Sequence, residues 1–351
     1  MSIFERAQQD HVGKWFEQRR KLGVSDTIYW ARYTPETDAI KMHEFQHANG
    51  DGMSIMKYML SELGYRHVEI PNCKEPGRPS KQQLKHIQKN MRPHPKKLNW
   101  LFWQADRQIG NNSINTFLFN RAETSNIRQR ARELNIPITT LVFWALNVCA
   151  AKKLMPANQD YAWFYPVNLR GAVQYASPYA NYSSGFYLSL NKDVSVQDLH
   201  QRIRNKLKSG EHWVNWQQAN ITKYLPGLAI RWIYRFISKR YFYAGNFSAM
   251  GDWLSDESGI YRAESAQDAK IAKERWFCSA PGTKNYPISA CMLTWNDQLT
   301  ITLKLHPAIV NDKYTSIETL CAWCENLLEG VVINPEEAKQ QRRIISFNCN
   351  D

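Results

Sequence analysis

The sequence has no predominantly apolar run of about 20 residues without a charged side chain, which is the length that a membrane-spanning helix needs. Its first residues, Met-Ser-Ile-Phe-Glu-Arg, contain neither the basic cluster nor the apolar run of a secretory signal peptide. These absences argue against a spanning protein and against an exported one. We therefore expect a soluble, cytoplasmic protein.

Cysteine is scarce, with seven residues whose spacing matches no disulfide or zinc-binding framework. The one pair at motif distance, Cys321 and Cys324, lies in a run whose apolar residues share one helical face. Packing in the core explains this pair better than redox chemistry or metal binding. We expect a reducing compartment and no metal site.

Acidic residues are outnumbered, 32 against 45 basic ones, and the formal charge is +13. Such a charge attracts nucleic acid, anionic lipid, or phosphorylated and acidic ligands such as coenzyme A and acyl carrier proteins. No helix-turn-helix, zinc-finger or aromatic RNA-binding signature accompanies it, so we expect no nucleic-acid partner. Residues 74–97 carry eight Lys or Arg and one acid, and their prolines indicate a basic surface connection with one short helix.

Apolar and aromatic side chains are abundant, at 43% and 13% of 351 residues, which is enough for a large core. The first part of the chain is expected to form a helix, two strands and a helix, over 2–22, 27–33, 40–47 and 53–64. Ser2 and Glu5 would form a capping box on the first helix. His47 then lies where a strand turns into a helix.

A second half begins at about residue 113. The expected order is strand, helix, buried helix, two strands and a helix, over 114–120, 123–136, 137–154, 160–171, 184–190 and 196–210. A β-hairpin turning at Asn296 and Asp297 and a helix around Cys321 close the chain. Strands and helices mix in both halves, and we expect an N-terminal lobe over 1–112 and a C-terminal lobe over 113–351.

The stretch HEFQHANGDGMS, residues 43–54, sets His47 four positions before Asp51 at a glycine turn. A histidine with a pKa near 6.5 can take a proton and return it at neutral pH, which suits acyl transfer to a hydroxyl or amine. Asp51 would more naturally brace the turn, and if buried it needs a partner of opposite charge. Arg170, at the end of the strand sequence PVNLR, is the expected partner.

Three stretches in order, QHANGDGMS, NLR and GNFSAMGDW, resemble the chloramphenicol acetyltransferase-like superfamily. That superfamily includes the BAHD acyltransferases, the wax ester synthases and the condensation domains of nonribosomal peptide synthetases. The resemblance spans about residues 25–330 and implies a mixed α/β fold of two lobes with a tunnel between them. The motif histidine would lie midway along that tunnel, and its early position in this chain implies a shortened first lobe.

The resemblance also implies roles for the matching residues. His47 would be the general base that deprotonates the acceptor. Asp51 and Gly52 would be structural members of the His-x-x-x-Asp-Gly motif, and Arg170 would pair with Asp51. The donor would be an acyl thioester of coenzyme A or of an acyl carrier protein, with coenzyme A slightly favoured, and no bound cofactor would be needed.

Asn246 and Ser248 lie near the position of a later superfamily motif. A side chain there could donate a hydrogen bond to the tetrahedral oxyanion, which contributes a factor of about 10² to 10³. The stretch NYSSGF, residues 181–186, resembles another segment of these enzymes, without the glycine before Asn181. Gln46 stands where condensation domains have a second histidine, which favours simple acyl transfer over peptide condensation.

Residues 224–245 combine Leu, Ile, Trp, Phe and Tyr with four basic residues. Two interpretations stay open: a core helix with arginines extended to the surface, or a helix that lies on a membrane and makes the protein peripheral. A lipid-like acceptor would favour the second, and a small molecule is the other acceptor class. The alternative to an acyltransferase is a non-catalytic, condensation-domain-like binding or scaffold protein in a biosynthetic assembly.

Overall fold

The computed structural model describes most of the chain. It covers residues 8–64, 70–73, 77–91, 98–104, 112–157, 159–254, 272–312 and 314–349. The capping box expected at Ser2 and Glu5 lies outside the described residues, as do parts of the basic segment 74–97. The described part of that segment contains the expected short helix.

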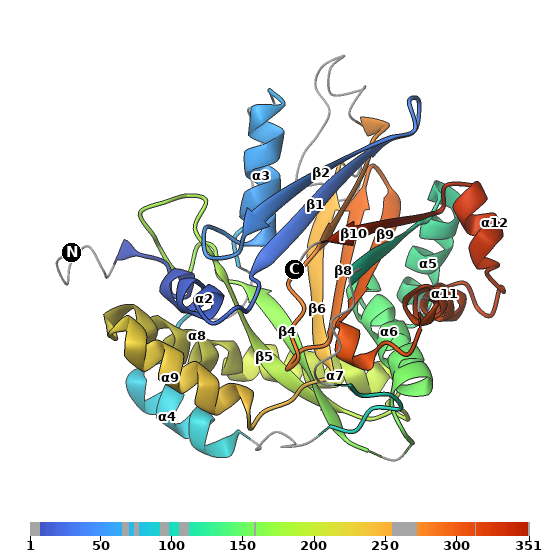
Figure 1. Cartoon of the computed structure of the whole chain (residues 1–351). Coiled ribbons are helices and arrows are strands. Elements are labelled where there is room, and N and C mark those ends of the chain that lie inside the picture. Colours follow the sequence, from blue (N-terminus) through green and yellow to red (C-terminus); the bar gives the residue numbers. More distant parts are fainter. Residues whose placement is uncertain are drawn as a thin grey trace.

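The described strands form two sheets (Figure 1). They are β1 (Thr27–Thr34), β2 (Ala39–Gln46), β3 (Asn112–Leu118), β4 (Tyr161–Asn168), β5 (Ser183–Leu190), β6 (Gly245–Trp253), β7 (Arg275–Ser279), β8 (Ile288–Trp295), β9 (Gln298–Leu305) and β10 (Ile344–Cys349). The seven-stranded sheet has the order β10-β3-β9-β8-β6-β4-β5, and the three-stranded sheet has the order β2-β1-β7. Strand β6 runs parallel to β4 and β8, whereas the other neighbours are antiparallel.

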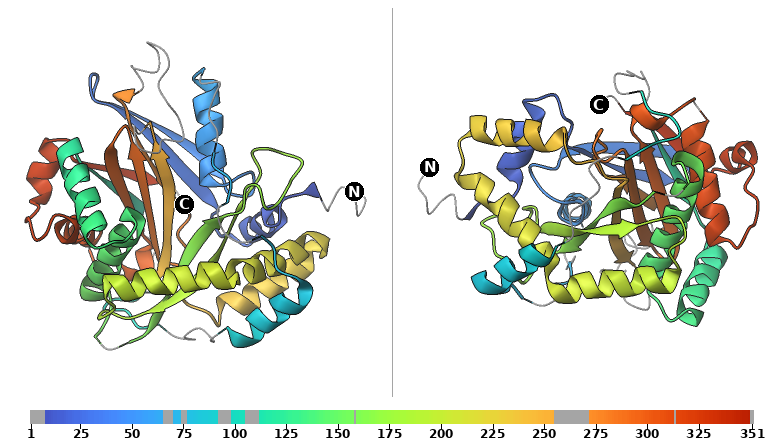
Figure 2. Two further views of the ribbon diagram at one scale, coloured as in Figure 1. Left: turned by 180° about the vertical axis from the view of Figure 1, so that it is seen from behind. Right: turned by 90° about the horizontal axis from the view of Figure 1, so that it is seen from below.

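Helices lie on both sides of the larger sheet. They are α2 (Gly13–Arg20), α3 (Gly52–Glu62), α4 (Lys81–Asn90), α5 (Arg121–Glu133), α6 (Ile138–Leu154), α7 (Val196–Ser209), α8 (Glu211–Ile221), α9 (Gly227–Ser238), α11 (Thr315–Leu327) and α12 (Pro335–Gln340), with short 3-10 turns at Thr222–Tyr224 and Pro307–Ile309. Helices α5, α6 and α11 cover one face of the sheet, while α3 and the three-stranded sheet lie on the other, as the view from behind in Figure 2 also shows. Helices α2, α4, α8 and α9 gather beside β5.

Alternation along the strands separates two apolar cores. In β8, Ile288, Ala290 and Met292 pack into the larger core with α5, α6 and α11. Cys291 and Leu293 point to the other face and pack with residues of β1 and α3. Successive side chains of a strand face opposite ways, so a sheet covered on both faces reads as a nearly unbroken apolar run.

Most of the expected elements are present, and the mixed α/β fold is confirmed. The hairpin of β8 and β9 turns at Asn296 and Asp297, whose φ angles of 48° and 59° are those of a tight hairpin turn. The long first helix is wrong for the described residues, because α2 begins only at Gly13. The Oδ1 atom of Asp10 accepts hydrogen bonds from the backbone N–H groups of Val12 and Gly13, which shapes the chain just before α2.

The first sheet draws on both halves of the chain. Strands β1 and β2 precede residue 112, but β7 comes from the second half and pairs with β1, with Trp30 opposite Cys278. The strands of the larger sheet all follow residue 111. The two lobes over 1–112 and 113–351 stay a prediction.

A helix that spans a membrane needs about 20 predominantly apolar residues. No described helix by itself is long and apolar enough to cross a bilayer, although α5 and α6 meet the criterion as a pair bent by 97°.

Candidate active site

Two carboxylates shape the loop that carries His47 between β2 and α3. The backbone N–H of His47 donates to the carbonyl oxygen of Asp26 at 2.8 Å, and that of Ala48 donates to the Asp26 carboxylate at 2.9 Å. Asp51 is the N-cap of α3, and its Oδ1 accepts from the backbone N–H of Ser54 at 2.9 Å. The loop is therefore fixed at both ends.

The two glycines that flank Asp51 are needed for close packing. A Cβ atom on Gly50 would lie 2.5 Å from the carbonyl oxygen of Tyr179, and one on Gly52 would lie 2.7 Å from Sδ of Met250. The first neighbour is backbone, whereas the second is the end of a flexible side chain. Gly52 thus has a packing role that the motif alone does not explain.

Two groups compete for Nδ1 of His47. It lies 3.0 Å from the carbonyl oxygen of Gly50, which can only accept a hydrogen bond, and 2.8 Å from the side-chain nitrogen of Asn181. The Asn181 amide is oriented by Ser183, whose N–H and hydroxyl both donate to its oxygen. The Gly50 carbonyl favours a proton on Nδ1, which leaves Nε2 free to act as a base, whereas Asn181 favours the other tautomer.

The ring of His47 is covered on one side. Phe16 of α2 stacks on it with ring centroids 4.4 Å apart and an angle of 16° between the planes. Burial lowers the pKa of His47 from its usual 6.5, and the negative charge of Asp51 partly offsets this effect. The ring is therefore neutral at pH 7, the state that a general base requires.

Asp51 and Arg170 form a buried ion pair. Nη2 of Arg170 donates to both oxygens of Asp51, at 2.7 and 2.9 Å, and also to the hydroxyl of Ser54 at 2.5 Å. Asp51 is 4% exposed and Arg170 8% exposed. Two further bonds complete the cluster: the N–H of Tyr182 donates to Asp51, and the guanidinium donates to Asn168 at the end of β4. The structure thus brings Asp51 together with the partner expected from PVNLR.

Asn246 and Ser248 lie on β6, on the face of the larger sheet that is turned toward α3. Phe247 between them packs in the core on the opposite face, and Met250 reaches the residues of β1 and α3. Ser248 is buried and Asn246 partly buried. In the part of the chain that the structure describes, no hydrogen bond joins either side chain to His47, and their roles stay predictions.

Sequence reasoning missed three neighbours of His47. Phe16 and Asp26 come from the chain before β2 and touch the loop from the outside. Asn181 lies in the stretch NYSSGF, which resembled a superfamily segment, but nothing local indicated that its amide reaches His47. The position of Asp26 directly before β1 was the one feature of the sequence that could have indicated a carboxylate holding a neighbouring loop.

His47 does not line either of two cavities in the described residues. One, of about 470 Å³, is lined by Glu17, Arg20 and Lys21 at the end of α2, and the other is a basic cavity at the β1–β2 turn. The tunnel expected from the resemblance stays a prediction. Within the same residues no group of His, Cys, Asp and Glu has the arrangement of a metal site.

Comparisons with known proteins identify the fold. No family model matches the sequence, and no curated protein matches it. The chain is similar in structure to a crystal structure of the nonribosomal peptide synthetase FmoA3, with a TM-score of 0.53 at 12% identity, over 83% of this chain and 32% of that one. It is also similar to the epimerization domain from the third module of tyrocidine synthetase B (0.49, 12% identity, 87% and 71%) and to the trichothecene 15-O-acetyltransferase TRI3 of Fusarium sporotrichioides (0.49, 11%, 83% and 66%).

The likeness to FmoA3 defines the class of fold. The chain shares a mixed α/β architecture with part of a nonribosomal peptide synthetase, so the expected resemblance is confirmed for the fold. The chain spans about a third of that protein's length, and at 12% identity the likeness shows the fold alone. The chemistry has to be argued from the residues of this chain.

Proposed function

We propose that the protein is an acyltransferase that moves an acyl group from a thioester to a hydroxyl or amine acceptor. Nε2 of His47 takes the acceptor proton as the acceptor attacks the thioester carbonyl. Ser248 or Asn246 donates a hydrogen bond to the oxyanion of the tetrahedral intermediate. The C–S bond then breaks, and protonated His47 returns the proton to the leaving thiolate.

The observation that supports this function most is the way in which His47 is held. Its loop is fixed by Asp26 on one side and by the buried pair of Asp51 and Arg170 on the other. The Gly50 carbonyl can hold the Nδ1 proton, and burial lowers the pKa so that the ring is neutral at pH 7. A fixed, neutral histidine with Nε2 available is what general base catalysis needs.

The proposed co-substrate is an acyl thioester of coenzyme A or of an acyl carrier protein in the cytoplasm, and the reaction needs no bound cofactor. Helix α4 supports an acidic or phosphorylated partner, because Lys81, Lys85 and Lys89 are exposed at four-residue spacing on one side of it. Leu84 anchors the opposite side in a small core with α8. Such a row of cations complements an acidic carrier protein.

Helix α9 supports a lipid-like acceptor reached from a membrane surface. Its exposed face carries Leu228, Trp232 and Phe236, which are 73%, 68% and 42% exposed, and within the helix Ile230 is the buried residue. This distribution differs from that of a core helix. The basic residues of segment 224–245 are Arg231, Arg235, Lys239 and Arg240, and no acid occurs between Glu211 and Asp252. We propose that α9 lies on an anionic membrane and makes the protein peripheral.

The test of the catalytic assignment uses purified protein with a panel of acyl thioesters and candidate acceptors, followed by mass spectrometry of both. His47→Ala should lower the rate about 10² to 10⁴-fold. His43→Ala, which removes a partly exposed histidine from β2, the strand before the His47 loop, should leave the rate within a factor of about two. In wild type, kcat/KM should fall with acid only below pH 6.5, because the pKa of His47 is lowered.

A second candidate is a non-catalytic binding or scaffold protein with the same fold. One observation favours it: Phe16 covers one face of the His47 ring. Turnover that is equal in wild type and His47→Ala would favour this candidate over the acyltransferase.

A further inference from the structure

A basic cavity of about 520 Å³ lies at the opposite end of the β1–β2 hairpin from His47. Its walls come from the turn between β1 and β2, the start of β7, the turn between β8 and β9, the start of α5 and the segment between α12 and β10. The eight residues of β2 lie between this turn and His47, and a strand of that length spans about 26 Å. The cavity is thus distinct from the His47 site.

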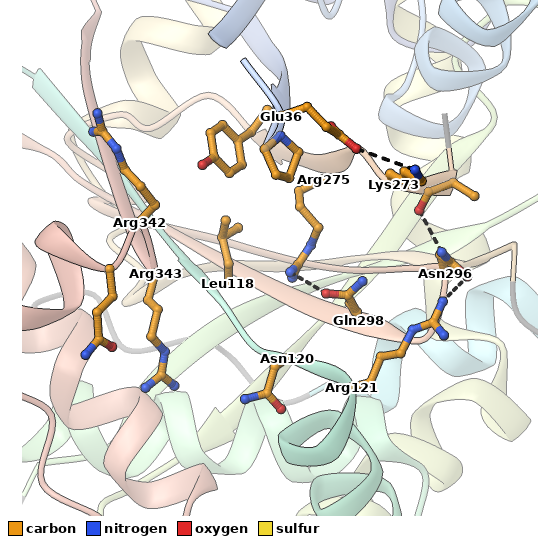
Figure 3. A pocket seen from close by; sticks show the side chains of 14 residues that line it. Glu36, Leu118, Asn120, Arg121, Lys273, Arg275, Asn296, Gln298, Arg342 and Arg343 are labelled. Atoms are coloured by element: carbon orange, nitrogen blue, oxygen red, sulfur yellow. Dashed lines mark hydrogen bonds and ion pairs between the residues drawn. The ribbon is translucent and has the colours of Figure 1, made fainter. Parts of the chain in front are cut away.

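The cavity is lined by five cationic side chains and one carboxylate. Figure 3 shows Arg275 at the centre, Arg342 and Arg343 on one side, and Lys273 and Arg121 on the other. Glu36 is the carboxylate, and it lies 4.0 Å from the ammonium group of Lys273. The cavity therefore has an excess of positive charge.

Three of the five cations are neutralised locally. Lys273 has Glu36, Arg342 pairs with Asp38, and Arg343 pairs with Glu123. The remaining two are Arg121, which donates to the neutral side chain of Asn296 at 2.8 Å, and Arg275. Among the described residues neither of these two forms an ion pair.

Arg275 is the more unusual of the two because it is buried. It is 7% exposed, and its two terminal nitrogens donate to Gln298 at 2.7 Å and to the carbonyl oxygens of Phe119 and Leu299 at 2.9 and 3.2 Å. All three acceptors are neutral, and its buried Nε has no acceptor. Burial lowers the pKa of Arg275 to about 10, so it stays charged at pH 7. The carboxylate of Glu123 attracts Arg275, but its ion pair is with Arg343. Buried charges are normally paired directly, so a buried cation that has only neutral hydrogen-bond acceptors and lines a cavity is suited to bind an anion.

The start of α5 adds to this field. Arg121 is the first residue of α5, and Asn120 caps it by accepting from the N–H of Glu123. The helix N-terminus carries a partial positive charge that favours an anion nearby. On the other side, Tyr33, Pro35 and Leu118 supply an apolar wall.

We infer that this cavity binds a diphosphate ester, with Arg121 and Arg275 on the phosphates and the apolar wall against the rest of the ligand. The volume lies within the range of small-molecule sites and exceeds what a bare phosphate needs. Guanidinium groups suit this role because they present several donors in a plane and bind phosphate in two-point geometry. Free nucleoside diphosphates and the nucleotide end of coenzyme A share this chemistry.

The test measures binding to the full chain by isothermal titration calorimetry, with ADP and coenzyme A as separate ligands. Arg121→Gln is the main variant because Arg121 is exposed at a helix start, so its loss leaves the fold intact. It should weaken binding about 10- to 100-fold, as expected for one charge-assisted contact to phosphate. Arg275→Gln should weaken it at least as much. Arg204→Gln, an exposed arginine on α7 at the far end of the molecule, is the matched control and should leave the affinity unchanged.

Three outcomes overturn the inference: neither ligand binds, Arg121→Gln binds as wild type does, or Arg204→Gln weakens binding equally. Binding of ADP and coenzyme A with similar affinity identifies a nucleotide site. Binding of coenzyme A alone identifies a site for the thioester donor and also supports the inference. His47→Ala should bind both ligands normally, so a failure of the catalytic assignment is separable from a failure of this one.

Discussion

The ion pair of Asp51 and Arg170 makes a quantitative prediction about stability. Asp51→Asn keeps the size of the side chain and its ability to cap α3, since asparagine is as good an N-cap as aspartate. The substitution therefore isolates the charge. It leaves Arg170 buried without a counter-ion, which costs about 3 to 5 kcal/mol. Arg170→Met leaves Asp51 unpaired, and we expect a loss of the same order.

The double variant should recover much of this loss. With Asp51→Asn and Arg170→Met combined, no charge is buried, so the free energy of unfolding should exceed the additive expectation by at least about 2 kcal/mol. The assay is urea unfolding at pH 7, with fluorescence and circular dichroism compared as a check of two-state behaviour. Glu336→Gln, which breaks an exposed pair with Lys339, is the control and should cost less than about 1 kcal/mol. Single variants within about 1 kcal/mol of wild type, or strictly additive losses, would refute the reasoning.

Three other predictions concern the loop, the histidines and α9. In urea unfolding, Gly50→Ala should destabilise the protein by about 1 to 3 kcal/mol more than Gly52→Ala does. The Cβ at position 50 would meet the backbone carbonyl of Tyr179, whereas the Cβ at position 52 would meet only the flexible end of Met250. Equal losses in the two variants would contradict this. Burial lowers the pKa of His11 to about 3 and that of His212 to about 4, so the unfolded chain binds more protons than the folded one below pH 6.5. Stability should therefore fall as the pH drops from 6.5 to 4, by up to roughly 1.4 kcal/mol per unit for each histidine, and His212→Gln should reduce that slope; a slope unaffected by the substitution would count against it. Wild type should float with vesicles that contain anionic lipid and not with neutral vesicles. Trp232→Glu should abolish flotation, whereas Lys192→Glu on a distant loop should not. Equal flotation of both variants would rule out contact through α9.

Local features of the sequence predicted local structure well. The turn residues Asn296 and Asp297 adopt the left-handed conformation of a tight hairpin, and the apolar run 137–154 is the buried helix α6. The strand, glycine turn and helix around His47 are also where the pattern indicated. The first helix was misjudged in the described residues: the apolar pattern continued through Asp10, whose side chain binds two backbone N–H groups just before α2.

By itself, the sequence determined most of the strands and helices, and also that His47 lies at a strand end followed by a helix. Periodicity, turn chemistry and caps act over a few residues, so they can be read without knowing the path of the chain. The pair of Arg170 and Asp51 was expected from the resemblance of PVNLR to a known motif, and its geometry came from the structure. Only the tertiary structure decided what else surrounds these residues. It sets Phe16 and Asn181 against His47, and it places Arg275, whose hydrogen-bond acceptors are all neutral, beside a cavity. Such contacts depend on how sheets and helices pack, and no local pattern encodes them.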